Sequence, residues 1–109
     1  MTHLEVAKMV ESIGLPFAYY QFDEGTAEPA PFIVYFYAMT DDLMADNTNY
    51  QRIDTLNIEL YTDFKDFELE KTVEDVLKEN NLTYYKEESF IDSEKLWQIA
   101  YEMEVIINE

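Results

Sequence analysis

The chain has 109 residues, and its 24 acidic and 7 basic side chains give a formal net charge of −17. A surface that binds duplex DNA needs clustered Lys and Arg to replace counterions, so this composition argues against direct nucleic-acid binding. The absence of cysteine excludes disulfides and thiolate catalysis, and a hydrophobic content of 48% indicates a folded domain rather than a disordered acidic chain.

The longest apolar run is FIVYFYAM, at residues 32–39, which is much too short to cross a bilayer as a helix. No basic stretch is followed by an apolar one, as it is in a secretory signal. We therefore expect a single soluble domain over residues 1–109, made in the cytoplasm and without membrane contact.

The first predicted element is a helix over residues 3–13. Thr2 and Glu5 have the spacing of a capping box. Gly14 is expected to end the helix, because glycine readily adopts the left-handed conformation that follows many helices. Apolar residues recur at helical spacing at Val6, Met9, Val10 and Ile13.

The glycines and prolines, which favour turns and interrupt helices and strands, are concentrated after this helix. Residues 14–31 contain every glycine and proline of the chain: Gly14, Gly25, Pro16, Pro29 and Pro31. Residues 18–22 alternate loosely and predict a short edge strand. Residues 23–31 predict a turn and an extended arm, because each proline removes a ladder donor. Residues 32–39 are apolar on both faces and predict a central strand that is covered on both sides.

A hairpin is predicted from this strand and the next. Residues 40–49 are polar and predict a long hairpin tip, in which Asp and Asn replace glycine as turn residues. Residues 50–62 predict the second strand, with Leu56, Ile58 and Leu60 on one face.

A second helix is predicted after this hairpin. Asp63 or Asp66 can cap its start, and Asn80–Asn81 is a plausible end. Its apolar stripe comprises Leu69, Val73, Val76 and Leu77. Its opposite face is expected to be solvated and carries Glu68, Glu70, Lys71, Glu74, Asp75 and Lys78.

Residues 82–91 and 94–107 predict a second hairpin, joined at Asp92–Ser93. The clearest alternation of the chain lies in the last strand, which places on one face Trp97, Ile99, Tyr101, Met103, Val105 and Ile107. Hairpins imply antiparallel pairing, and amphipathic helices need a sheet face to cover. We predict an α+β fold with two helices packed on one face of a mainly antiparallel sheet, in the order α-β-β-α-β-β, with a possible extra short edge strand.

The sequence contains no recognisable catalytic or cofactor motif. His3 is the only histidine, and at the start of a helix it is expected to be a solvated or dipole-neutral helix residue rather than a catalytic group. Phosphate-cradling glycine motifs are absent. Carboxylates that could hold a divalent cation match no metal motif: Asp41, Asp42, Asp46, Glu87 and Glu88. We expect a protein that is not an enzyme and that has no cofactor or metal, and a carboxylate-based metal enzyme is the least favoured alternative.

The aromatic residues come in pairs and triplets, and most are expected in the core or on sheet faces. Stacking of nucleic-acid bases occurs in basic grooves, which this composition does not provide. A protein interface is the alternative for Tyr19, Tyr20 and Tyr37, because tyrosine is enriched at interfaces.

Three long segments together resemble small proteins that siphophages and prophages of Gram-positive bacteria encode among their head–tail connector and tail genes. These segments are GLPFAYYQFDEGTAEPAPFIVYFY, ADNTNYQRIDTLNIELYTDFKDFELE and LTYYKEESFIDSEKLWQIAYEMEV. Similar phage proteins show an "LP-AYY-F-EG-A-PPP-I-Y" start, an "ADN-Y" turn, an "ELYTD-KD-ELE" junction and a "Y-KEE-YI-SE-LYQ-IYE-E" end. The resemblance covers nearly the whole chain, although Glu28-Pro29-Ala30-Pro31 replaces a full proline run.

The resemblance implies a tail-completion or tail-terminator protein with two helices on a sheet. Such proteins form a ring at the end of the tail tube, stop its polymerisation and join it to the head. The implied partners are other copies of the chain in a ring of about six subunits, the tail tube protein and a head-completion or connector protein. The implied location is the host cytoplasm during assembly and then the head–tail junction of the virion.

Under this interpretation the arm at residues 23–31 lies along a neighbouring subunit, and the hairpin tip at residues 40–49 contacts the tube or the head. The full set of candidate interface residues is Tyr19, Tyr20, Asp23, Glu24, Gly25, Pro29, Pro31, Tyr37, Asp42, Asp46 and Asn47. A crossover loop and a solvated turn are the alternatives for these two segments. The alternative for the whole chain is an acidic inhibitor that mimics DNA and occupies a host or defence protein.

Overall fold

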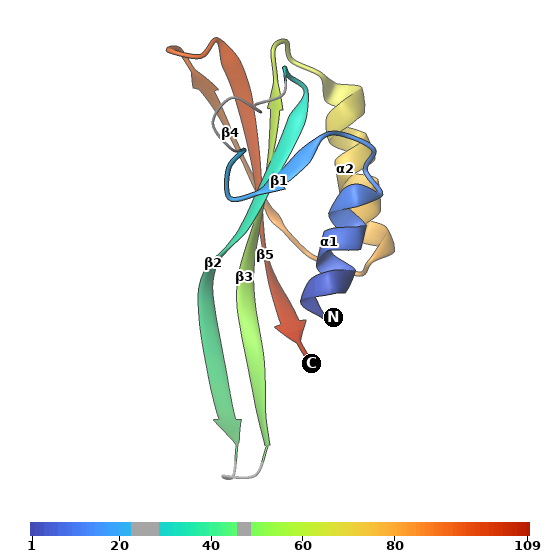
Figure 1. Cartoon of the computed structure of the whole chain (residues 1–109), viewed down its shortest axis with the longest axis vertical. Helices are drawn as coiled ribbons and strands as arrows, with labels where there is room; N and C mark the ends of the chain where they lie inside the picture. Colours follow the sequence, from blue (N-terminus) through green and yellow to red (C-terminus); the bar gives the residue numbers. More distant parts are fainter. Residues whose placement is uncertain (23–28, 46–48) are drawn as a thin grey trace.

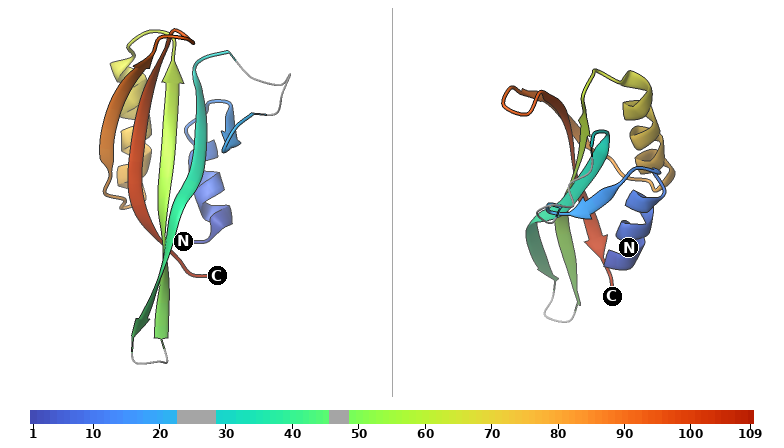
Figure 2. Two further views of the ribbon diagram at one scale, coloured as in Figure 1. Left: turned by 90° about the vertical axis from the view of Figure 1, so that its left-hand side faces the viewer. Right: turned by 45° about the horizontal axis from the view of Figure 1, so that its top comes forward.

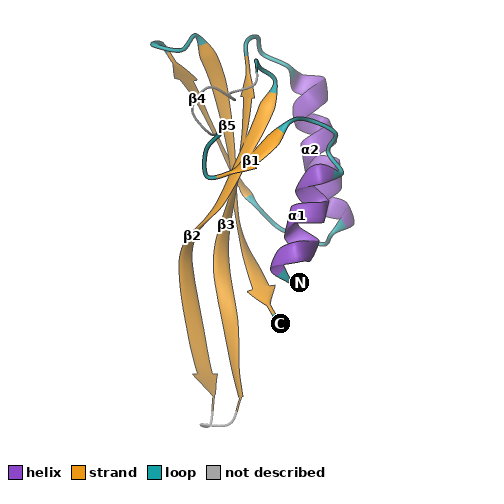
Figure 3. Cartoon of the chain, in the orientation of Figure 1, coloured by secondary structure: helices purple, strands orange, loops and turns teal. Residues whose placement is uncertain are grey.

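The computed structural model describes residues 1–22, 29–45 and 49–109, with side chains described outside residues 41–51. In this part of the chain the elements are α1 (His3–Glu11), β1 (Phe17–Tyr19), β2 (Phe32–Ala45), β3 (Asn49–Thr62), α2 (Phe67–Glu79), β4 (Tyr85–Ile91) and β5 (Leu96–Ile107). Figure 1 labels them along the chain, and Figure 3 shows the helices beside the sheet.

The sheet is mixed and has the strand order β1-β2-β3-β5-β4. The short strand β1 pairs in parallel with β2, and every other pairing is antiparallel. The predicted α+β class is confirmed, and β1 adds a parallel edge to the expected hairpins. In the described part of the chain, neither helix has the length and apolar content needed to span a membrane.

The prediction that residues 32–39 form the central strand is wrong, because β3 occupies the middle of the sheet and β2 lies beside the edge strand. The apolar character of both faces of β2 has another cause. One face buries Ile33 and Tyr35 in the core. On the other face Phe32 stacks on Tyr61, with ring centroids 4.9 Å apart, and Phe36 packs edge-on against Tyr20.

Side-chain caps begin both helices, and a residue in the left-handed conformation follows each of them. The Thr2 hydroxyl accepts a hydrogen bond from the Glu5 backbone N–H and the Glu5 carboxylate accepts one from the Thr2 N–H, which completes the predicted capping box. Gly14 has φ +91°, the left-handed conformation expected after the helix. Asp66 caps α2 through the Leu69 N–H, and the predicted left-handed asparagine after that helix is Asn81, at φ 60°.

The core lies between the helices and one face of the sheet. Alternate residues of β3 and β5 enter it, as predicted, and residues of both helices join the same cluster. Its members are Val6, Met9, Val10, Ile13, Ile33, Tyr35, Leu56, Ile58, Leu60, Val73, Leu77, Ile99, Tyr101, Met103, Val105 and Ile107. The opposite face, which we call the open sheet face, has no helix over it in the described part of the chain (Figure 2).

The first hairpin is longer than predicted. The ladder between β2 and β3 continues to the pair Ala45 and Asn49, so most of the predicted tip at residues 40–49 is strand. The register shifts between Tyr37 and Met39, which leaves Ala38 as an extra residue of a β-bulge. The hairpin extends past both chain ends in Figure 1 and helps to make the molecule elongated, with extents of 50 × 29 × 23 Å.

The second hairpin is shorter than predicted. Strand β4 covers residues 85–91 rather than 82–91, and β5 covers residues 96–107 rather than 94–107. Residues 92–95 form the turn between them, where Lys95 has φ 55°. Strand β4 is exposed along most of its length and is an edge of the sheet.

Candidate functional site

Two of the predicted interface tyrosines lie together on the helix side of the sheet. Tyr19 ends β1, and its ring lies 6.0 Å from that of Tyr37 and edge-on to Tyr35 at 5.2 Å. The Tyr37 backbone N–H donates to the Tyr19 hydroxyl oxygen at 3.4 Å. Tyr19 is 51% exposed, so this cluster reaches the surface at the β1 edge.

The third tyrosine lies on the open sheet face. Tyr20 follows β1 with φ 69°, an uncommon value for an aromatic residue, and the Gln21 N–H donates to the Tyr19 carbonyl across it at 2.8 Å. This tight turn carries the chain across the edge of the sheet, where the Tyr20 ring meets Phe36 at 5.7 Å. Tyr20 therefore does not join the cluster of Tyr19 and Tyr37.

The remaining predicted interface residues are described only in part. Pro29 and Pro31 are exposed in the segment before β2, and the Ala30–Pro31 peptide bond is cis. Asp42 lies in β2 opposite Arg52, but its side chain lies outside the described residues. The other predicted residues also lie outside them: Asp23, Glu24, Gly25, Asp46 and Asn47.

A buried carboxylate that the sequence analysis missed lies within the ladder of the first hairpin, opposite Thr40. Asp54 is fully buried, and its Oδ1 accepts hydrogen bonds from the Thr40 hydroxyl at 2.6 Å and from Arg52 Nε at 3.2 Å. His3 Nε2 lies 3.3 Å from its other oxygen. Burial raises the pKa of Asp54, but the hydrogen bonds from Thr40, His3 and Arg52 lower it more, so the pKa is below its usual value.

His3 is only partly solvated. Its side chain is about one-third exposed, its Nδ1 contacts the Glu109 carboxylate, and its ring packs edge-on against Tyr37 at a centroid distance of 5.0 Å. A signal for Asp54 was present in the sequence, because it has the same alternation as Leu56 and faces the core. Arg52 lies only two positions from Asp54 on β3, but its other partners, Thr40 and His3, come from other elements and carried no sequence signal.

A second ionic cluster lies between α2 and the sheet, and it includes residues that were predicted on the outer face of α2. Glu70 was expected to be solvated, yet it is 2% exposed, and Lys65 and Lys86 both reach its carboxylate. Lys86 Nζ lies 2.8 Å from both Glu70 Oε1 and Glu74 Oε2. The Tyr101 hydroxyl donates to the same Glu74 oxygen at 2.8 Å. The cluster therefore ties α2 to β4 and β5.

The pKa values in this cluster follow from its geometry. Burial opposes the charge of Glu74, but the hydrogen bonds from Lys86 and Tyr101 outweigh it and lower the pKa of that carboxyl. Burial likewise opposes the charge of Lys86, but Glu70 and Glu74 outweigh it and raise its pKa. Two lysines, Lys65 and Lys86, face three carboxylates, because Lys65 also pairs with Glu88. Every lysine of the cluster is paired, which is the pattern of a structural ion-pair network.

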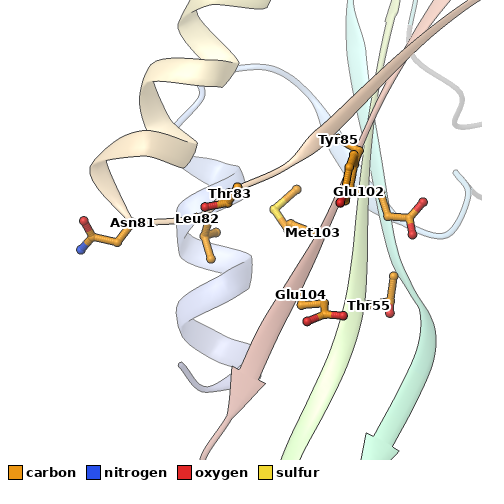
Figure 4. A pocket seen from close by; sticks show the side chains of 8 residues that line it. All are labelled: Thr55, Asn81, Leu82, Thr83, Tyr85, Glu102, Met103 and Glu104. Atoms are coloured by element: carbon orange, nitrogen blue, oxygen red, sulfur yellow. The ribbon is translucent and has the colours of Figure 1, made fainter.

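A pocket of about 450 Å³ lies where the chain passes from α2 to β4 beside β5 (Figure 4). Its lining residues are Thr55, Asn81, Leu82, Thr83, Tyr85, Glu102, Met103 and Glu104. The two glutamates are exposed, and the lining contains no histidine, cysteine or lysine. It offers no nucleophile paired with a general base. In the part of the chain that the structure describes, no three His, Asp or Glu side chains are grouped to hold a metal ion.

Charged side chains are distributed unevenly over the molecule, and those of the open sheet face are acidic. Three of its acidic side chains, Glu59, Glu102 and Glu104, alternate with the core residues of β3 and β5. A fourth, Glu87, is on β4, where it pairs with Ala100. All seven basic residues lie elsewhere. They are on the helices, beside them, in the last turn or on the helix side of the sheet: Lys8, Lys65, Lys71, Lys78, Lys86, Lys95 and Arg52. One face of the sheet therefore has acidic side chains and no cation.

The β2 side of the open sheet face is aromatic. Phe22 packs edge-on against Phe32 at 5.3 Å, and Phe32 stacks on Tyr61. The Tyr61 hydroxyl donates to Glu59 at 2.9 Å and accepts from Gln98 Nε2 at 2.7 Å. Burial and the hydrogen bond to Glu59 raise the pKa of Tyr61 to about 12, so its hydroxyl stays neutral at physiological pH.

No protein-family model and no curated protein matches the chain. Among solved structures, its fold is similar to that of a chain from "Virion of native gene transfer agent (GTA) particle", with a TM-score of 0.65. The similarity covers 94% of this chain and 86% of that chain at 12% sequence identity. At this identity the comparison establishes a shared fold over nearly the full length of both chains.

Proposed function

We propose that the chain is a non-enzymatic structural protein of a phage-like virion, which caps the tail tube and forms part of the head–tail joint. The observation that carries this proposal is the fold shared with a component of a gene transfer agent virion along 94% of the chain. A fold by itself hosts many functions. The tail position therefore rests on the resemblance to phage tail-completion proteins.

The shape of the molecule supports assembly into a ring. A closed ring of one protein needs two different surfaces on each subunit, which meet head to tail. The long first hairpin projects past the body at one end of the molecule, and the exposed strand β4 lies at the far edge of the sheet from β1 (Figures 1 and 2). The proposed partners are other copies in a ring of about six, the tail tube protein and a head-completion protein.

The charge separation also supports a role beside a DNA path. Lys and Arg hold phosphates by releasing counterions, and the open sheet face carries glutamates without either cation. A surface of this kind lets DNA pass without binding it. We infer that the protein assembles in the host cytoplasm and remains in the virion at the head–tail junction.

The test is deletion of the gene from the genome that encodes it, with complementation from a plasmid. We expect lysates with DNA-filled heads and separate tails of abnormal length under the electron microscope, and normal particles after complementation. Infectious particles of normal appearance without the gene would contradict a structural role. Joined particles with tails of normal length but impaired DNA delivery would contradict tail capping.

An acidic inhibitor that mimics DNA is the second candidate, and the charge separation favours it as well. A face with glutamates and no cations can occupy the DNA site of a basic nuclease. Competition between the purified protein and DNA for such an enzyme, together with normal virions after gene deletion, would support the inhibitor. Absence of competition leaves the structural role.

A further inference from the structure

The distal part of the first hairpin has little support from the rest of the sheet. We call residues 43–45 of β2 and 49–51 of β3 the distal ribbon. Strand β1 pairs with β2 only as far as Tyr35, and β5 pairs with β3 only as far as Arg52. Beyond these points the ribbon consists of its own two strands, and an isolated two-stranded ribbon is marginally stable in water. Its direction must therefore be fixed at its base.

The base of the ribbon contains the buried Asp54. Thr40 is its direct partner in the ladder between β2 and β3, and the β-bulge at Ala38 lies just before this pair. A bulge bends a strand and leaves its direction to local contacts. The Thr40 and Arg52 side chains converge on one Asp54 oxygen, so a single carboxylate joins both strands where the ribbon leaves the body.

The same carboxylate reaches the helix layer. His3, in the first turn of α1, directs Nε2 to Asp54 and Nδ1 to Glu109. His3 therefore joins α1 to both carboxylates, one on β3 and one at the end of the chain. The Met1 amino group donates to the Ile106 carbonyl at 2.8 Å, which holds the start of α1 against the end of β5. The base of the ribbon, α1 and the end of β5 therefore meet at one cluster.

Because Asp54 is buried, its carboxylate needs all of its hydrogen-bond donors at once. A carboxylate without solvent exposure is tolerated only while its hydrogen bonds are complete, and loss of one partner leaves a charge without compensation. We propose that Asp54 is a lock that fixes the direction of the distal ribbon relative to α1. When the lock is broken, the ribbon moves as a unit while the five-stranded body keeps its structure.

The test combines two measurements on the full chain. The sequence has no cysteine, so Lys8→Cys on α1 and Met44→Cys on the ribbon give a spin-label pair that reports their distance by pulsed EPR. Amide hydrogen exchange by NMR then compares the ribbon amides with those of Ile58 and Ile99 in the body. Asp54→Asn is the test variant. Asp75→Asn, on the exposed side of α2, is the control because it removes the same charge away from the ribbon.

In Asp54→Asn we expect a broadened distance distribution and ribbon exchange that is faster by about tenfold or more, as expected for loss of hydrogen bonds to a charged group. The body amides and the control variant should keep wild-type values. An unchanged distance distribution would overturn the lock. Equal acceleration of ribbon and body amides would also overturn it, because Asp54 would then stabilise the whole domain.

Two milder variants keep the test decisive if Asp54→Asn does not fold. Thr40→Val removes the contact with β2, and His3→Ala removes the contact with α1. Each should broaden the distance distribution while the body amides stay protected. Wild-type distances in both variants would overturn the proposal.

Discussion

At the residue scale, two buried carboxylates set this molecule apart from an ordinary acidic protein. The carboxylates of Glu70 and Asp54 lie where there is almost no solvent, and each is held by donors from other elements. Most of the other acids lie on the surface, where a charge costs little and an ion pair contributes little. Substitutions at the two buried sites should therefore have effects that surface substitutions lack.

The first prediction concerns Lys86. Lys86→Met keeps much of the side-chain volume but removes the cation that lies 2.8 Å from both Glu70 and Glu74. Glu70 then keeps only Lys65, and we expect a loss of about 2 kcal/mol in the free energy of unfolding. Urea denaturation measures this change. Lys71→Met, which breaks an exposed pair on α2, is the matched control, and an equal loss in both variants would contradict the prediction.

The second prediction concerns the pH dependence of stability. The pKa of Asp54 is lower in the folded chain than in the unfolded one, where it is about 3.9. Its contribution to stability is therefore present above pH 4 and is lost as the pH falls through the lower folded value. Because Asp54 holds the distal ribbon, the ribbon amides of Asp54→Asn should exchange faster than those of wild type at pH 7, and the ratio of the two rates should fall toward 1 below pH 4. A ratio that stays constant between pH 7 and pH 3 would contradict this origin.

At the element scale, sequence patterns correctly predicted the features that depend on residues close together in the sequence. Apolar alternation located β3 and β5, and the capping box located the start of α1, because both depend on neighbours in sequence. Partners that lie far away in sequence could not be found in this way. Alternation places Asp54 on the core face, but only the fold brings His3, 51 positions earlier, to its carboxylate.

The same limit explains the errors for β2 and for the outer face of α2. The run at residues 32–39 predicted a strand covered on both sides, but it could not reveal that aromatic neighbours supply one cover. Helical periodicity placed Glu70 among solvated residues, because the lysine on β4 that compensates its burial is invisible to periodicity. Among the predicted interface residues whose side chains the structure describes, Tyr19 and Tyr37 are the two that come together.

The third prediction tests the left-handed turns that end the elements. Gly14 has φ +91° and open space around its α-carbon, so Gly14→Ala adds backbone strain without a clash. We expect it to destabilise the chain by about 1 kcal/mol. Lys95 has φ 55° in an exposed turn, and Lys95→Gly should relieve strain and stabilise by up to about 1 kcal/mol. Thermal unfolding measures both, and equal signs would contradict the prediction.

At the scale of the whole molecule, the separation of charges connects stability, shape and assembly. All seven cations lie off the open sheet face, and four of them pair with acids that also lie off this face: Arg52, Lys65, Lys71 and Lys86. The glutamates of the open face have no such compensation from cations on that face. When copies of the chain bring their open faces toward a common axis, these glutamates repel one another.

The last prediction concerns this repulsion in self-association. The charge of −17 per chain should keep copies apart at low ionic strength, where the screening length is ~10 Å at 0.1 M salt. At 1 M salt it falls to ~3 Å, and we expect sedimentation velocity to show a discrete oligomer of about six subunits. Neutralising the open face with Glu59→Gln, Glu102→Gln and Glu104→Gln should allow the oligomer at lower salt.

The control for this variant neutralises the same number of acids on α2, through Glu68→Gln, Asp75→Asn and Glu79→Gln. If the open face lines the ring, the control variant should need more salt than the open-face variant, because its charges are on the outside and farther apart. Equal salt requirements would place the open face away from the axis. A monomer at every salt concentration would contradict spontaneous ring formation and would restrict assembly to the end of the tail tube, where a bound template aligns the subunits.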